Sequence, residues 1–200
     1  YADSYRSFYL HFDMRIDSSG ALRFALNQMF QPSSTFMTFL QTIKENTQIE
    51  AGDNEYMMSI SGKMKDFAFI KRLIDDKNVV TPELDKYRIL LDQMKTDLQQ
   101  EITGIPKKNG KDDPFASLKS QLTPLGQIAF AINRQDNVSY LNLTTQWLDS
   151  VGITRRWRDI FLAPVWTTYF LGMNEVEQQI AHSWEEIVEA NINPLYKKFP

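Results

Sequence analysis

The stretch APVWTTYFLGMNEVEQQIAHSWEEIVEANINP, residues 163–194, decides the fold. Its large apolar residues recur at intervals of three and four, which places them on one stripe of an α-helix. Roughly 29 residues at about 1.5 Å each predict a helix on the order of 40 Å long. Pro164 suits its first turn, because the missing N–H would be unpaired there, and Pro194 ends it. The stripe comprises Trp166, Tyr169, Phe170, Met173, Val176, Ile180, Trp184, Ile187, Val188 and Ile192.

The same helical spacing recurs along the rest of the chain. The clearest start signal is Thr81-Pro82-Glu83, a cap residue followed by proline and by an acid in the first turn. No stretch shows the alternation of a β-strand beside turn residues. The sequence therefore predicts an all-α fold, a multi-helix bundle with a long C-terminal amphipathic helix. The other expected helices cover residues 1–16, 22–30, 36–43, 64–74, 84–102, about 114–134, about 138–151 and about 155–162.

Two polar stretches interrupt these helices. Residues 47–61 lose the periodicity, and residues 104–113 form a Lys-rich loop. We expect a single helical domain over residues 1–200, which the loop 104–113 could divide into 1–103 and 114–200. Because the chain begins at Tyr1, we also expect it to be a fragment of a larger protein.

The composition is that of an ordinary globular protein, with 42% hydrophobic and 24% charged residues in 200. The net charge is −3, and the cationic residues are scattered among acids, so no basic face indicates a nucleic-acid partner. No apolar run approaches the roughly 18 residues of a membrane span. The absence of cysteine excludes disulfides and thiolate metal sites.

Catalytic motifs are weak. Residues 104–111, GIPKKNGK, differ from a phosphate-binding loop, because five residues separate the glycines and Asp112 replaces the magnesium-binding Ser or Thr. No Gly-x-Ser-x-Gly elbow occurs. We interpret His11 and His182, the two histidines, as helix-face residues. The sequence therefore predicts no catalytic residue, metal site or cofactor.

Candidate partner contacts lie in the polar stretches and at one tryptophan. Exposed loops often carry binding residues, and loop lysines could contact an acidic partner or a lipid headgroup. The four tryptophans are interpreted as core residues where the last helices cross, with a protein interface as the alternative. The candidate contacts are Lys107, Lys108, Lys111, Gln48 and Trp157.

Three segments, in this order, carry a resemblance to a known family: YADSYRSFYLHF (1–12) with ALRFALNQMFQPSSTFMTFLQTIKENTQI (21–49); FAFIKRLIDDKNVVTPELDKYRILLDQMKTDL (67–98); and IFLAPVWTTYFLGMNEVEQQIAHSWEEIVEANINPLYKKFP (160–200). The chain resembles the IcmF/TssM family, inner-membrane proteins of type VI and type IVB secretion machines. Phe8-Tyr9, where the family often has tryptophan, and Phe199, where tyrosine is usual, leave the subfamily open.

The resemblance implies the helical periplasmic part of an inner-membrane protein, acting as a structural scaffold in a secretion-system membrane complex. The implied partners are other copies of the same protein. Other parts of the parent chain would bind a DotU/TssL-type inner-membrane protein and an outer-membrane lipoprotein, the latter through a β-rich segment beyond residue 199. The alternative is a helical ligand- or peptide-binding domain, in one form a hydrolase. A cleft that joins His182, Glu185 or Asp159 to another ionisable group would favour it.

Overall fold

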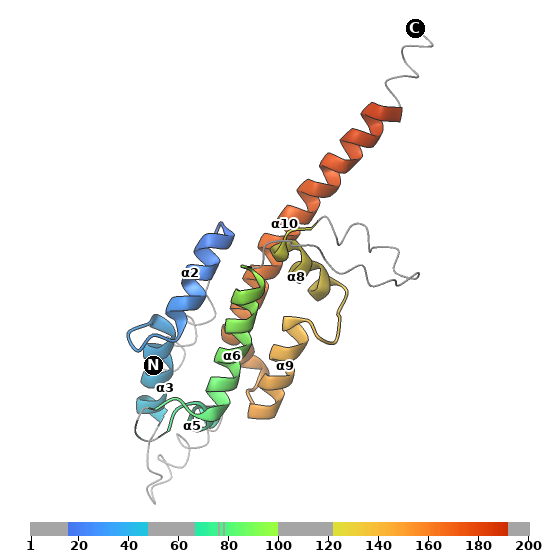
Figure 1. Cartoon of the computed structure of the whole chain (residues 1–200). Coiled ribbons are helices and arrows are strands. Elements are labelled where there is room, and N and C mark those ends of the chain that lie inside the picture. Colours follow the sequence, from blue (N-terminus) through green and yellow to red (C-terminus); the bar gives the residue numbers. More distant parts are fainter. Residues whose placement is uncertain (1–15, 48–66, 76, 78, 100–121, 192–200) are drawn as a thin grey trace, which may run out of the picture.

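The computed structural model describes residues 16–47, 67–75, 77, 79–99 and 122–191 (Figure 1). Within these ranges the regular elements are helical, and the one β feature is an isolated bridge between Ile74 and Val80. The prediction of an all-α fold is confirmed. The elements are α2 (Ser19–Met29), α3 (Thr35–Thr47), α5 (Ile70–Leu73), α6 (Pro82–Asp97), α8 (Pro124–Asn133), α9 (Tyr140–Val151), the short 3₁₀ helix η2 (Arg155–Trp157) and α10 (Arg158–Asn191).

Helices α2, α3, α6, α8 and α9 each begin with a serine or threonine cap. The cap oxygen accepts a hydrogen bond from a backbone N–H of the first turn, which would otherwise be unpaired. Thr81 accepts from Leu84 N, as the Thr81-Pro82 signal predicts. The other caps are Ser18, Ser34, Thr123 and Ser139.

The helix predicted over about 114–134 is present in its described part as α8, but it starts later than the described residues would allow. Helix α8 begins only at Pro124, and Leu122 and Thr123 precede it outside the helix. A proline disfavours the α region for the preceding residue, so Thr123 is extended and caps a new helix. The helix predicted over 64–74 likewise keeps only α5 among its described residues, because Ile74 is extended and joins the bridge to Val80.

Two helix ends also differ from the prediction. Helix α6 ends at Asp97 and a turn follows it at Leu98 and Gln99, whereas Ile102, which the predicted helix was expected to reach, lies outside the described residues. Helix α10 begins at Arg158 and joins the short helix predicted over 155–162 to the terminal one. Pro164 therefore lies inside α10, although an interior proline costs about 3 kcal/mol. The buried side chains of Phe161 and Val165 offset this cost by packing this part of α10 into the core.

The first half of α10 runs through the bundle and packs against α2, α8 and α9 (Figure 1). Aromatic rings fill the centre: Tyr87 of α6 stacks on Trp147 of α9 at 4.6 Å, and Phe161 of α10 meets both edge-on. Tyr87 Oη donates to the carbonyl of Phe161 at 2.6 Å. This core joins residues from both sides of loop 104–113. The loop itself lies outside the described residues, so the sub-division at that point stays a prediction.

Gly172 sets the distance between α10 and α8. A Cβ atom at this position would lie 2.5 Å from the carbonyl oxygen of Leu125 and 2.6 Å from Cβ of Ala129. Only glycine allows this approach of the two backbones. Near the same crossing, Thr123 Oγ1 donates to the carboxylate of Glu175. The crossing fixes the direction in which the second half of α10 leaves the bundle.

Candidate interaction surface

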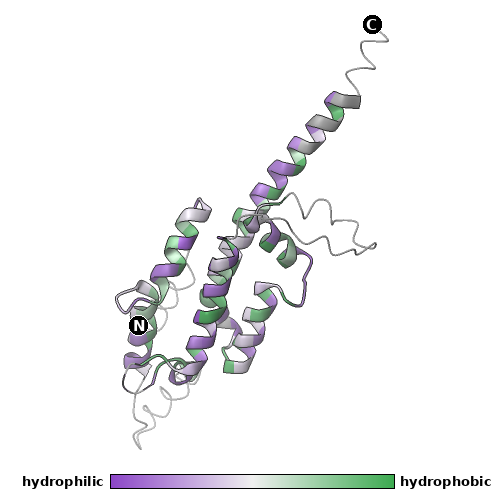
Figure 2. Cartoon of the chain, viewed as in Figure 1, coloured by the Kyte–Doolittle hydropathy of each residue, from purple (hydrophilic) through white to green (hydrophobic). Residues whose placement is uncertain are grey.

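The second half of α10 extends past the rest of the described bundle (Figure 1). Helix α8 packs along the middle of α10, where Gly172 and Val176 are buried. From Glu177 to Glu189, the described side chains are exposed or only partly buried. Hydrophobic and hydrophilic residues are interspersed along this projecting half (Figure 2). It is an amphipathic helix whose apolar side faces solvent.

Large exposed side chains lie on the apolar side of α10, from Phe170 beside the α8 crossing to Trp184 in the projecting half. Phe170 is 61% exposed, Ile180 49% and Trp184 65%, and Met173 between them is partly buried. An aromatic side chain in a core or an interface typically buries about 150–250 Å². Phe170 and Trp184 therefore still expose a large apolar area that a partner could cover. The expectation that all four tryptophans lie in the core is wrong for Trp184.

An aromatic cluster forms the base of this apolar side. The rings of Trp166, Tyr169 and Phe170 lie with centroids 5.3–6.3 Å apart, as neighbours along one helix face. Tyr169 Oη lies 3.3 Å from Oδ1 of Asn133 at the end of α8, which ties the cluster to the bundle. The exposed surface therefore begins where α10 contacts the end of α8 and continues outward along α10.

No family model, curated protein or solved structure matches the chain. Of the described helices, none combines the length and the apolar character that a membrane crossing needs.

The charged side chains on this part of α10 are glutamates, with no lysine or arginine among them. Between Asp159 and Asn191 the sequence has no lysine or arginine, whereas glutamates occur at positions 175, 177, 185, 186 and 189. Glu177 is exposed and lies between Met173 and Ile180 on the apolar side. A surface of this kind favours apolar partners that also carry positive charge.

The candidate partner contacts predicted from the sequence are separated by the structure into two groups. Lys107, Lys108, Lys111 and Gln48 lie outside the described residues. Trp157 is only 5% exposed, and its ring packs on Phe67 at 4.8 Å and on Phe69 at 6.4 Å. Its Nε1–H has no hydrogen-bond partner in the described part of the chain. In the isolated chain Trp157 is therefore a packing residue.

Of the residues named for the alternative binding or hydrolase function, Asp159 lies at the start of α10, far from His182 and Glu185, which are three residues apart on the projecting half. His182 and Glu185 are exposed on the projecting half. Asp159 lies in a shallow hollow of about 500 Å³ with Arg155 and Arg158, between η2 and the start of α10. Arg158 is already bound to the carboxylate of Asp149 and to the carbonyl of Ile153. Among the described residues that line this hollow, Asp159 is accompanied by no histidine, serine or second acid that would form an acid–base pair with it.

The described side chains form no set of metal ligands. Among the side chains that the structure describes, no group of three or more histidines and acids comes together. Glu186 follows His182 by four residues, the spacing of a helical ligand pair, but its side chain lies outside the described set.

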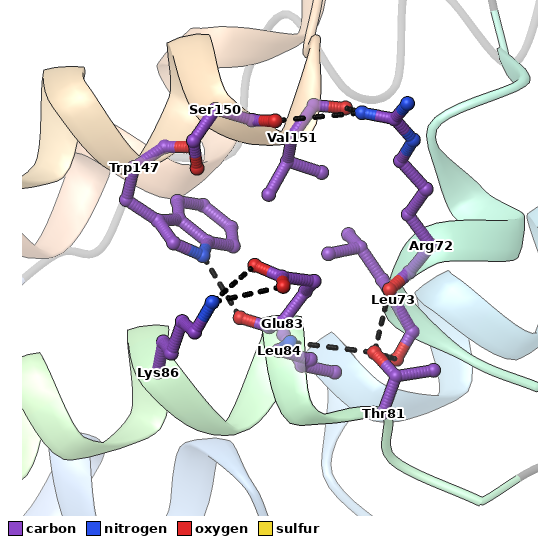
Figure 3. A network of polar contacts seen from close by, with 9 residues as sticks. All are labelled: Arg72, Leu73, Thr81, Glu83, Leu84, Lys86, Trp147, Ser150 and Val151. Carbon is purple, nitrogen blue, oxygen red and sulfur yellow. Dashed lines mark hydrogen bonds and ion pairs between the residues drawn. The ribbon is translucent and has the colours of Figure 1, made fainter.

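A polar network joins α5, α6 and α9 beneath the core, and its roles are structural (Figure 3). The guanidinium of Arg72 donates to the carbonyl of Val151 at 3.0 Å, at the end of α9 where carbonyls lack helical partners. Trp147 Nε1 donates to the carbonyl of Glu83 at 2.8 Å. Thr81 Oγ1, the cap of α6, also donates to the carbonyl of Arg72. Because these polar atoms bond to one another, the network serves to hold the helices together.

The apolar stripe of α10 was predictable from the sequence, whereas its exposure to solvent was not. Periodicity shows which face of a helix is apolar, and it carries no information on what covers that face. One signal was available in the sequence: a charged residue, Glu177, lies within the stripe. A glutamate within an otherwise apolar stripe indicates that this part of the stripe is not buried in the core, because glutamate is almost never fully buried unless it is paired.

Proposed function

We propose that this chain is a structural scaffold module of a bacterial secretion-system membrane complex of the type VI kind, acting through protein–protein contacts in the periplasm. The observation that carries the proposal is the exposed apolar side of α10, with Phe170 beside the bundle and Ile180 and Trp184 in the projecting half. Contiguous apolar surface on a soluble domain is characteristic of interaction sites. Aromatic residues and methionine, which line this surface, are enriched at such interfaces.

The stability of the projecting half supports the same proposal. Most helical stability in proteins comes from the packing of an amphipathic face on other elements. The projecting half of α10 continues a helix that is anchored in the bundle, but it extends beyond the described bundle (Figure 1). A partner that packs on its apolar side would therefore stabilise it as a helix. This favours a binding role over a catalytic one.

The secretion-system assignment rests on the resemblance to the IcmF/TssM family. Its segments 21–49, 67–98 and 160–200 include helices α2 and α3, helices α5 and α6, and helix α10. On this basis the proposed partners are other copies of the protein, together with a DotU/TssL-type protein and an outer-membrane lipoprotein that bind other parts of the parent chain. The proposed location is the periplasmic part of an inner-membrane protein.

The test is photocrosslinking of the parent protein in cells, with a photoreactive amino acid at Ile180. The matched control places it at Gln178, which is exposed on the same helix but about 200° away around its axis at about 100° per residue. We expect crosslinks to envelope proteins of the secretion complex from Ile180 and few from Gln178. Equal crosslinking from the two positions, or none from Ile180 in expressing cells, would contradict the proposal.

A further inference from the structure

The apolar side of α10 from Phe170 to Trp184 has the spacing of a coiled-coil seam. Phe170, Glu177 and Trp184 are seven residues apart, and Met173 and Ile180 occupy the alternate positions, three residues after Phe170 and Glu177. At about 100° per residue these five side chains fall within about 80° of the helix circumference. This is the a/d pattern by which one helix packs along another. We call these five residues the α10 seam.

Glu177 is the one charged residue of the α10 seam, and it lies at the centre. Phe170 and Met173 precede it and Ile180 and Trp184 follow it, so a helix docked on the seam would cover its carboxylate. A carboxylate removed from water without a positive partner costs several kcal/mol. The occupant of the seam must therefore bring a cation to this position.

A second copy of α10 does not supply that cation. In a parallel pair in register, Glu177 would face Glu177 of the other copy, and like charges in a seam destabilise it. In an antiparallel pair the facing stretch would again have no lysine or arginine, because none occurs from Asp159 to Asn191. The pairing of two α10 helices is thus disfavoured in either direction.

A lipid surface fits no better. Helices that lie on membranes carry lysine and arginine on the polar side, which anionic headgroups attract. The projecting half instead carries glutamates at 177, 185, 186 and 189, which such headgroups repel. The charge pattern selects a basic protein.

We propose that the α10 seam binds an amphipathic helix of another protein, which covers Phe170, Ile180 and Trp184 with apolar side chains and pairs a lysine or arginine with Glu177. This inference rests on the proposed scaffold function and adds the chemistry of the partner. The ion pair sets the register of the two helices, because a shift by one turn moves the cation away from Glu177. A single polar pair at an a position is known to fix register in this way.

The test uses the full chain and two synthetic probe peptides with the sequence of residues 166–191. One peptide carries lysine at position 177 and the other keeps glutamate, so they differ in one charge. Binding is measured by fluorescence anisotropy of the labelled peptides, with the wild-type chain and with its Glu177→Lys variant. Glu177 is exposed, so the variant is expected to keep the fold, which circular dichroism checks. A Glu189→Lys variant, with the charge changed outside the seam, is the control.

We expect the lysine peptide to bind the wild-type chain about tenfold more tightly than the glutamate peptide, and the preference to reverse with Glu177→Lys but not with Glu189→Lys. Equal binding of both peptides would overturn the inference, since the seam would then not select charge. Preferred binding of the glutamate peptide would identify a second copy as the occupant. Binding to anionic vesicles in place of the lysine peptide would identify a membrane. Each of these outcomes overturns the inference.

The failure of this inference is distinguishable from the failure of the scaffold function. If neither peptide binds while Ile180 still crosslinks to envelope proteins, the scaffold function stands and the basic-helix partner is wrong. If Ile180 crosslinks to no protein in cells, the scaffold function itself fails, whatever the peptides do.

Discussion

Replacing Gly172 by alanine tests the crossing that directs α10 out of the bundle. The added Cβ would lie 2.5 Å from the carbonyl oxygen of Leu125 and 2.6 Å from Cβ of Ala129, so two helix backbones must move apart. Overpacking of this kind costs about 1–3 kcal/mol. Alanine regains up to about 1 kcal/mol of helix propensity over glycine. We expect a net loss on the order of 1–2 kcal/mol in the free energy of unfolding.

The assay is urea unfolding followed by far-UV circular dichroism, together with a thermal scan. For a chain of this size the expected loss lowers Tm by roughly 2–8 °C. Gly20→Ala is the matched control, because its new Cβ would meet no atom within 4 Å. We expect this control to be neutral or slightly stabilising. If Gly172→Ala were as stable as the wild type, α8 and α10 would not approach as closely as described, and the argument for a fixed direction of α10 would be refuted.

Three further predictions concern the core, one cap and the projecting half. Tyr87→Phe removes the hydrogen bond to the Phe161 carbonyl and should lower the free energy of unfolding by about 1 kcal/mol at neutral pH. Burial raises the pKa of Tyr87 above its ordinary value of 10, so above pH 10 the unfolded state loses this proton more readily than the folded state. The wild type should therefore lose stability above pH 10, and the variant, which lacks the hydroxyl, should lose less. Urea titrations from pH 7 to pH 11 measure both effects. Thr123→Val removes the α8 cap and the hydrogen bond to Glu175, and should lower the free energy of unfolding by about 1–2 kcal/mol in the same urea assay, with an unchanged value contradicting the cap. Trp184→Ala should change that energy by less than about 0.5 kcal/mol, because its ring is largely exposed, yet it should weaken crosslinking from Ile180; a large loss of stability would place Trp184 in the core.

Helix starts were predictable from the sequence where a cap stood beside a proline and a clear break. Thr81-Pro82 follows an extended stretch, and the apolar spacing resumes just after it, so the start of α6 was evident. Thr123-Pro124 has the same chemistry, but apolar residues lie on both sides of it, and the spacing ran across the break. The cap signal outweighs the spacing there, because proline constrains the backbone of the residue before it.

The position of Pro164 was misinterpreted for a different reason. Proline favours the first turn of a helix, so a start near residue 164 was the natural inference. The structure instead continues the helix through Pro164, because the turns around it are packed into the aromatic core through Phe161 and Val165. Tertiary packing of this kind has no signature in a local pattern.

The candidate site shows the same limit. The apolar stripe of α10 was visible in the sequence, and its exposure was not, since exposure depends on where α8 ends in space. Trp184 and Trp147 illustrate the point: both are tryptophans of amphipathic helices, yet one is exposed and the other stacks on Tyr87 in the core. The predicted contacts at Lys107, Lys108, Lys111 and Gln48 lie outside the described residues and stay predictions.

The central claim is that the apolar side of the projecting half is a protein-docking surface. Hydroxyl-radical footprinting of Trp184 tests this claim most directly. The oxidation rate of Trp184 is compared between the isolated chain and the parent protein in its native membranes, with buried Trp147 as the internal reference. We expect Trp184 to react fast in the isolated chain and to be protected in the membranes, while Trp147 reacts slowly in both. Equal oxidation of Trp184 in the two samples would show that nothing docks there and would contradict the claim.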